Sequence, residues 1–255
     1  MASVVEIDLF GPMVVRGLAF PFRRSSAREL VAYLALHRDG VRNEVWSEAL
    51  WPTRVVSQAT CDSTVSDCRR ALGCDGDGMA RLVRDGRILR LADSVHTDVE
   101  QFARLASADH PEAWRRALGL VRGTLLEGMQ LSDWAVFDGT QAQVESMVVI
   151  TARKAVEYCL ASGRAEQAEW AVRQGLRACP YDERLYRALL RATAAQGNLV
   201  QLRCTMAELR AIAGADQEGA GAVPGPAAMH PDTEALFQEL LNSSIRAVGA
   251  SAPRL

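Results

Sequence analysis

The chain has 255 residues, of which 49% are hydrophobic and 24% are charged, and its formal net charge at pH 7 is −2. This length and composition are those of a globular protein with two domains of ordinary size. The near-neutral charge excludes a globally basic nucleic-acid-binding protein. Any contact with nucleic acid must therefore depend on where individual charges lie.

Several other classes are excluded by segments that the sequence lacks. No run of 18 apolar residues occurs, and the first residues do not resemble a signal peptide, so we expect a cytoplasmic chain without membrane contact. The six cysteines form no Cys-x-x-Cys pair and the four histidines are scattered, so we expect neither a metal nor another cofactor. Nucleophile-elbow, zincin and phosphate-loop motifs are also missing, and Lys154 is the only lysine. We therefore expect no enzyme.

The N-terminal part predicts short strands. Apolar and polar residues alternate over 4–10, and two shorter apolar runs follow at 13–15 and 19–22. Glycine and proline separate these runs, which is typical of turns between strands. The pattern predicts a small antiparallel sheet of three strands.

Three helices are predicted next. They begin near Ser26, Asn43 and Ser57, and the third runs to Leu72, where Gly73 is a suitable C-terminal cap. The second and third helices, joined by a short turn, have the order of a helix-turn-helix. The third would then be the helix that enters the major groove of DNA.

This third helix has two predicted faces. Cys61, Val65, Cys68 and Leu72 are spaced four, three and four residues apart, so they share one face and pack on the core. We expect the opposite face to present Thr60, Ser63, Thr64, Asp67 and Arg70. Hydroxyls and arginines suit base edges and phosphates, whereas a carboxylate fits only if it accepts from cytosine or orients Arg70. The alternative is an ordinary solvated face.

A hairpin is predicted around Asp85-Gly86, which is a common two-residue turn. With this turn Arg84 lies opposite Arg87 and Arg81 lies opposite Arg90. Like charges across a ladder repel one another, and a DNA phosphate between them would relieve the repulsion. Alternatively, these arginines point into water. Arg54 could add a further phosphate contact. The sheet, helices and hairpin together predict an α+β winged helix-turn-helix domain over residues 1–97, with the hairpin as the wing.

Residues 98–255 predict an all-helical second domain. The expected helices are 98–107, 111–122, 141–162, 164–178, 182–197, 199–213 and 232–247. Gly163 and Gly197 are 34 residues apart, each at a turn between two helices, and small or apolar residues follow both at offsets 5, 9 and 12. This period is that of tetratricopeptide repeats. Residues 214–231 are rich in glycine, alanine and proline and predict a flexible loop.

Six segments carry a resemblance to a known family. They are Arg28–His37, Glu48–Pro52, Val65–Gly73, Ala117–Gly123, Pro180–Tyr186 and His230–Phe237. In this order they resemble the SARP/AfsR-type transcriptional regulators (Streptomyces antibiotic regulatory proteins). The resemblance implies a winged helix of the response-regulator type and a tetratricopeptide-like bacterial transcriptional activation domain. A closer resemblance still is to the C-terminal segment of large actinobacterial proteins of this family, so the chain could be a fragment of one.

From these features we interpret the chain as a sequence-specific DNA-binding transcription regulator that activates. Its expected partners are double-stranded DNA and, through the helical domain, RNA polymerase, another protein or a second copy of the chain. The alternative is a protein-interaction module whose winged helix no longer binds DNA, which the near-neutral first domain and the aspartates at 62 and 67 favour. A regulator with a small-molecule pocket between the helical repeats is a third reading.

Overall fold

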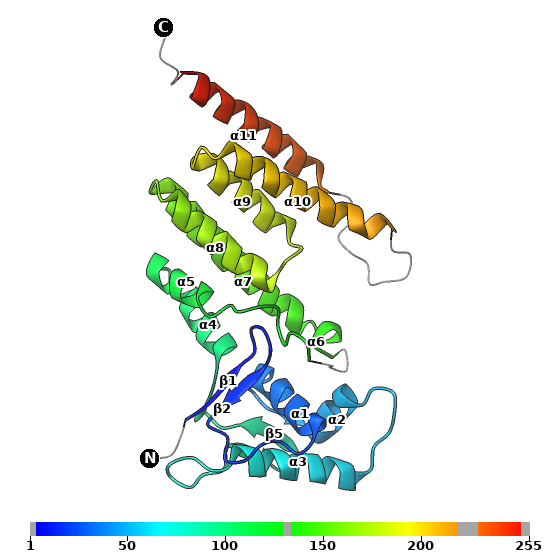
Figure 1. Ribbon diagram of the computed structural model, residues 1–255. Coiled ribbons are helices and arrows are strands. Elements are labelled where there is room, and N and C mark those ends of the chain that lie inside the picture. Colours follow the sequence, from blue (N-terminus) through cyan, green and yellow to red (C-terminus); the bar gives the residue numbers. More distant parts are fainter. Residues whose placement is uncertain (1–3, 130–133, 219–228, 251–255) are drawn as a thin grey trace. The chain divides into compact units, whose positions relative to one another are not determined.

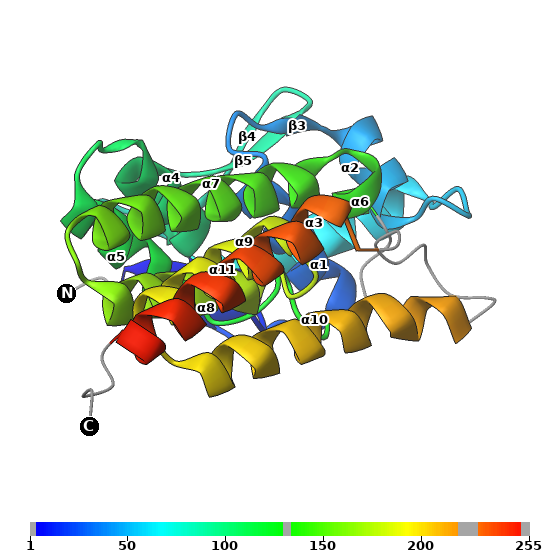
Figure 2. The ribbon, with the colours of Figure 1, turned by 90° about the horizontal axis from the view of Figure 1, so that it is seen from above.

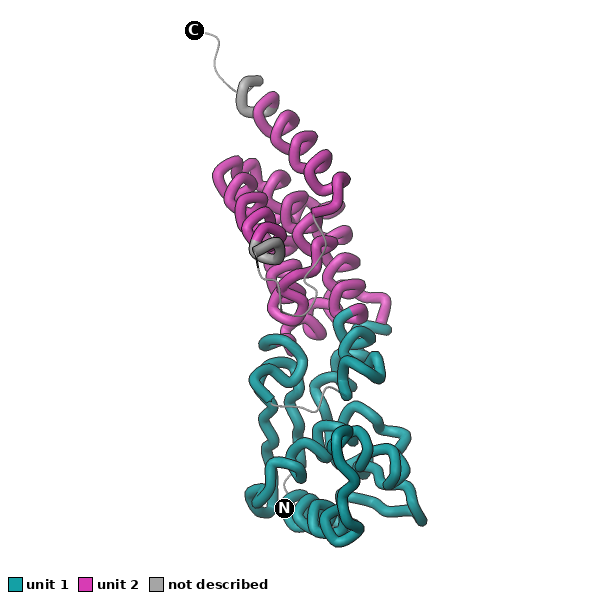
Figure 3. Tube along the Cα trace, turned by 90° about the vertical axis from the view of Figure 1, so that its right-hand side faces the viewer, with its two compact units in different colours: residues 1–107, 122–145 teal, residues 108–121, 146–255 magenta. Residues whose placement is uncertain are grey.

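The computed structural model describes residues 4–129, 134–218 and 229–250. The chain divides into two compact units (Figure 3). Residues 1–107 and 122–145 form the first unit, and residues 108–121 and 146–255 form the second. This division differs from the boundary that the sequence suggested after residue 97, because helix α4 (Asp98–Ser107) and residues 122–145 pack with the first unit.

The first unit contains an N-terminal sheet in the order β2-β1-β6. Strand β1 (Val5–Asp8) pairs antiparallel with β2 (Val14–Arg16) and parallel with β6 (Val95–Thr97). The predicted third strand at 19–22 is wrong. The amide of Ala19 donates instead to the carbonyl of Ala71 at 2.8 Å, so this segment packs beside a helix and joins no sheet.

A second sheet has the order β3-β5-β4 and contains the predicted hairpin. Strand β3 is Val41–Arg42, β4 is Leu82–Asp85 and β5 is Ile88–Leu91. The predicted register is wrong by one residue: Asp85 pairs with Ile88, and the two-residue loop is Gly86-Arg87. Gly86 has a φ of +56°. A turn that needs positive φ at its first central position favours glycine there. Gly86 therefore occupies the first position of the loop and not the second, so the loop lies one residue later than predicted.

Helices α1 (Ser25–Leu36), α2 (Asn43–Leu50) and α3 (Gln58–Leu72) complete the core of the first unit, with the short α6 (Trp134–Phe137). Figure 1 shows α1, α2 and α3 grouped with the second sheet. Leu34, Trp46 and Leu72 are almost completely buried between these elements. Truncating a buried tryptophan to alanine typically costs about 3–5 kcal/mol, so this core is large enough to fix the position of α3.

Asp98 attaches helix α4 to the first unit. Its carboxylate accepts from the amides of Leu9 and Phe10 at 2.8 and 3.0 Å, just after β1 ends. Burial raises the pKa of Asp98, although the two amides act in the opposite direction. Phe10 and Phe102 lie with ring centroids 5.3 Å apart. These contacts give the Thr97-to-Phe102 segment a structural role at the end of the sheet.

The second unit is helical in its described part. Its elements are α5 (Pro111–Leu118), most of α7 (Thr140–Ala161), α8 (Ala165–Ala178), α9 (Glu183–Ala195), α10 (Leu199–Glu218) and α11 (Pro231–Ala250). Helix α9 contacts α8, α10 and α11, and Figure 2 shows these helices from the side. Gly163 and Gly197, at the turns after α7 and α9, have φ of +69° and +70°.

The 34-residue period predicted from the sequence corresponds to equivalent buried positions in α8 and α10. The pairs are Ala168 with Leu202, Val172 with Met206, and Gly175 with Leu209, all of them buried. A Cβ on Gly175 would lie 3.1 Å from side-chain atoms of Ala152 and Leu185. Glycine at this position therefore permits close packing of α8 on its neighbours.

The segment predicted as a loop at 214–231 is partly helical, because α10 continues to Glu218. Residues 219–228 of that prediction lie outside the described residues. Helix α11 then begins at Pro231, where Glu183 of α9 accepts from the amide of His230 at 3.0 Å and from the hydroxyl of Thr233. In the described part of the chain, no helix is both long and apolar enough to cross a membrane.

Candidate nucleic-acid interface

Helix α3 is the element that the sequence analysis assigned to the major groove. Ser57 caps its N-terminus by accepting from the amide of Thr60 at 3.3 Å, and Gly73 ends it with a φ of +67°. The predicted core face of α3 is confirmed, since Cys61, Val65, Cys68 and Leu72 are all buried. The Cys68 thiol also donates to the carbonyl of Ala27 at 3.2 Å, which holds α3 against α1.

The predicted exposed face of α3 is largely wrong. Thr64 is completely buried, and its hydroxyl donates to the carbonyl of Thr60 at 3.0 Å. Asp67 is only 6% exposed. The Ser63 hydroxyl is half-buried and also donates to the carbonyl of Thr60, while the Thr60 hydroxyl lies 3.0 Å from that of Ser57. These four side chains are used inside the helix and its surroundings and do not form a free polar surface.

Asp67 stabilises the start of α1. One carboxylate oxygen accepts from the amides of Arg23 and Arg24 at 2.8 and 3.0 Å, and Arg24, the N-cap of α1, makes no side-chain capping bond of its own. Burial by itself would raise the pKa of Asp67, but the hydrogen bonds from Arg70 and the two amides outweigh it and lower the pKa. Asp67 therefore acts as a capping group supplied by another helix.

Arg70 is part of the same structural contact. Its guanidinium donates to the second carboxylate oxygen of Asp67 at 2.7 Å and to the carbonyl of Pro21 at 2.5 Å, and it lies over the ring of Phe20 at 5.5 Å. This explains why residues 19–22 are not a strand: their backbone is held by α3. The prediction that Arg70 and Asp67 face DNA is replaced by an internal role for both.

The outward face of α3 consists of side chains that the sequence analysis did not place on its major-groove face. Gln58, Asp62, Ser66 and Arg69 are exposed and follow one another at spacings of four, four and three. The side-chain amide of Gln58 donates to the carboxylate of Asp62 at 3.1 Å. A glutamine, a serine and an arginine on one helix face can supply the hydrogen-bond donors and acceptors that base edges and phosphates require.

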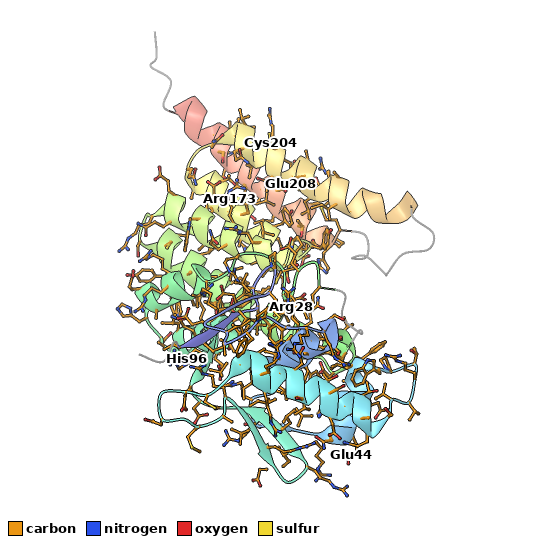
Figure 4. The ribbon with its side chains drawn as sticks, turned by 60° about the horizontal axis from the view of Figure 1, so that its bottom comes forward. Arg28, Glu44, His96, Arg173, Cys204 and Glu208 are labelled. Carbon is orange, nitrogen blue, oxygen red and sulfur yellow. The ribbon has the colours of Figure 1, made fainter. Side chains whose placement is uncertain are left out.

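The hairpin adds positive charge beside this helix. Arg84 pairs with Leu89, and not with Arg87 as predicted, and both arginines are exposed. The Arg87 guanidinium lies 3.4 Å from the carboxylate of Glu44, and both side chains are mostly exposed. Figure 4 shows Glu44 near the end of the hairpin, on the same side of the first unit as α3. Such an exposed ion pair is weak and can exchange for another anion.

Arg81 and Arg54 differ in their surroundings. Arg81 is 4% exposed, and it donates to the carbonyl of Leu72 at the end of α3, so it does not oppose Arg90 as predicted. Arg54 is exposed in the segment between α2 and α3, as are Thr53 and Val55. Three of the predicted residues, Arg54, Arg84 and Arg87, are therefore available to solvent.

The arrangement has the features of a binding surface. Among the described residues, no group of three or more His, Cys, Asp or Glu side chains could hold a metal ion. The exposed polar face of α3 and the arginines of the hairpin can instead bind an extended anionic partner by hydrogen bonds and charge.

Comparisons with known proteins concern the second half of the chain and the fold. The sequence model of the family described as "Bacterial transcriptional activator domain" matches residues 88–210. Mycobacterium tuberculosis EmbR, solved in complex with a low-affinity phosphopeptide, superposes with a TM-score of 0.58 at 21% identity, over 97% of this chain and 70% of that one. At this identity the likeness concerns the fold. No curated protein matches the chain.

The activator-domain match and the mixed α+β fold define the class of the chain as a transcription regulator. The six motifs quoted from the sequence follow the order of one family within this class. Residues 88–210 match the activator domain, and in its motifs and fold the chain is similar to the SARP-type transcriptional regulators.

Proposed function

We propose that the chain is a sequence-specific DNA-binding transcriptional activator. In this proposal the first unit is a winged helix-turn-helix of the response-regulator type, α3 lies in the major groove and the β4–β5 hairpin contacts the phosphate backbone. The observation that carries the proposal is the exposed face of α3 beside a hairpin with two exposed arginines. Helices of this kind read base edges, while neighbouring arginines fix the position of the protein on the duplex.

Within this proposal Gln58, Ser66 and Arg69 contact bases or nearby phosphates, because their side chains are exposed on one face. Arg84 and Arg87 bind phosphates from the hairpin. Arginine suits this task because its planar guanidinium can bind a phosphate through two hydrogen bonds.

The second unit is the tetratricopeptide-like activation domain of the proposal. Stacked helix pairs present extended surfaces that bind peptides or helices. We assign to this unit the contact with RNA polymerase, with another regulatory protein or with a second copy of the chain. The solved structure of EmbR contains a phosphopeptide, so a protein ligand is compatible with this fold.

A double variant tests the DNA-binding part. Fluorescence anisotropy is measured with a duplex from the region upstream of the coding sequence and with a mixed-sequence duplex. Arg84→Ala with Arg87→Ala is expected to weaken binding to both on the order of tenfold or more at moderate salt, because two phosphate contacts are lost. The matched control is Arg177→Ala with Arg203→Ala, two exposed arginines of the second unit, which should leave the affinity unchanged.

A second candidate is a protein-binding surface without DNA affinity. Asp62 favours it, since this carboxylate is exposed within the face of α3 that would meet phosphates. The pairing of Arg87 with Glu44 reduces the positive charge of the hairpin in the same way. If neither duplex binds at low salt while the chain is folded, the result contradicts DNA binding and favours this second candidate.

A further inference from the structure

A cavity of about 630 Å³ lies within the second unit, between the start of α5, the end of α7 and the first half of α8. Its volume is within the range of sites that bind small organic molecules. All the residues that line it belong to the second unit, so the cavity does not depend on the surface assigned to DNA.

The cavity has a floor of small residues and two aromatic walls. Ala155 and Ala171 are buried and line it, and Cys159 beside them is partly buried. Tyr158 of α7 and Trp170 of α8 also line it and remain 39% and 36% exposed. Large aromatic side chains that stay partly exposed around a hollow are suited to contact a flat apolar ring.

One guanidinium at the edge of the cavity can bind an acidic group on such a ring. The Arg164 guanidinium lies 5.5 Å from the centre of the Tyr158 ring, and among the ion pairs of the described residues it has none. The other guanidinium, that of Arg115, is bound through two hydrogen bonds to Glu112 at 2.9 and 2.6 Å. Arg164 is therefore the cation available to a ligand carboxylate.

Two further polar groups define the ligand more closely. Glu166, in the first turn of α8, lines the cavity and is exposed, so its carboxylate can accept from an N–H or O–H group of a ligand. Burial raises the pKa of the Cys159 thiol, while the charge of Arg164 acts in the opposite direction. Since its pKa is raised, the thiol is uncharged at neutral pH and adds no negative charge to the floor.

We propose that this cavity is a binding site for a small aromatic acid that also carries a hydrogen-bond donor. The aromatic ring lies between Tyr158 and Trp170 over the alanine floor. The carboxylate binds Arg164, and the donor group binds Glu166. This site is independent of the proposed DNA contact, so either can fail without the other.

Isothermal titration calorimetry with three probes of the same ring tests the site: indole-3-acetate, uncharged indole and tryptamine. We expect indole-3-acetate to bind at least tenfold more tightly than tryptamine, because only the acid pairs with Arg164. Binding that does not distinguish the acid from the amine, or no binding of any probe at millimolar concentration, would overturn the proposal.

Variants of two exposed arginines keep the test of the charge contact independent of folding. Arg164→Gln is expected to reduce the affinity for indole-3-acetate to that for indole. Arg153→Gln, an exposed arginine of α7 that does not line the cavity, should change nothing. Ala171→Leu should block all three probes by filling the floor, with an unchanged circular-dichroism spectrum as the check of folding. An Arg164→Gln variant that binds the acid like the wild type would refute the assignment.

Discussion

Replacing Asp67 with alanine separates an internal role of this residue from a role in DNA recognition. The substitution removes two amide contacts at the start of α1 and the ion pair with Arg70. Loss of an N-cap costs about 1 kcal/mol, and a hydrogen bond to a charged group contributes about 1.5–3 kcal/mol. In the variant, Arg70 keeps its hydrogen bond to the carbonyl of Pro21, and its side chain is 25% exposed. The loss in free energy of unfolding is therefore smaller than when one partner of a fully buried ion pair is removed. We expect a loss of about 3 kcal/mol.

The free energy of unfolding is measured by urea titration, with Asp62→Ala as the control. Asp62 is exposed on the same helix, so its removal should change the stability by less than about 0.5 kcal/mol. A variant Asp67→Ala with wild-type stability and reduced DNA affinity would refute the internal role. The opposite result, reduced stability with DNA affinity retained under conditions where the variant is folded, is the one we predict.

The same residue makes a prediction for pH. The folded state lowers the pKa of Asp67, so the carboxylate stabilises the fold fully above its unfolded-state pKa of about 3.9. This contribution is lost as the pH falls through the lower, folded-state pKa. The difference in unfolding free energy between the wild type and Asp67→Ala should therefore be largest near pH 7 and should shrink below about pH 4. A difference that grows on acidification would contradict this.

Three further predictions concern other parts of the chain. Asp62→Ala should raise the DNA affinity by a few-fold in anisotropy, since a carboxylate near phosphates is repulsive; reduced affinity would instead give Asp62 a contact with a base. Glu183→Ala should speed amide exchange in α11, because the start of that helix loses its acceptor, and unchanged exchange would show that packing alone holds it. Gly17→Ala should lower the melting temperature, because the new Cβ would clash with the carbonyl of Val4. Gly78→Ala is the control: its Cβ would contact no atom, so it measures the effect of the positive φ alone.

Much of the fold could be predicted from the sequence because it depends on local signals. The apolar stripe of α3, its start near Ser57 and its end at Gly73 are all visible along the chain, and the structure has them where they were expected. The turns at Gly163 and Gly197 are local too, since a positive φ there favours glycine. Helix α4 was predicted with the same bounds that it has in the structure.

The remaining features depend on contacts between distant segments. Thr64 and Asp67 were expected on the outer face of α3 because they are polar, yet Asp67 is buried by the backbone that precedes α1, more than 40 residues away. Strand β6 was missed because its three residues form a strand only beside β1, about 90 residues earlier. The hairpin register depended on the backbone conformation of Gly86, which the sequence Asp-Gly alone does not fix.

One signal could have identified the candidate DNA-contacting face of α3. Arg24 caps α1 without a side-chain acceptor, and a helix start that lacks its own cap needs an acceptor from elsewhere. A carboxylate on a neighbouring helix, such as Asp67, satisfies that need. With Asp67 assigned to the interior, the predicted orientation of α3 changes by part of a helical turn. Gln58, Ser66 and Arg69 then lie on the predicted exposed face, as they do in the structure.

The salt dependence of binding tests most directly whether the first unit binds DNA through α3 and the hairpin. The association constant with the upstream duplex is measured by anisotropy over a series of salt concentrations. With about three to five arginine–phosphate contacts, log K should fall against log salt concentration with a slope of about −3 to −5. The Arg84→Ala, Arg87→Ala double variant should bring that slope about two closer to zero. A slope near zero, or no binding at low salt by the folded chain, would contradict the account.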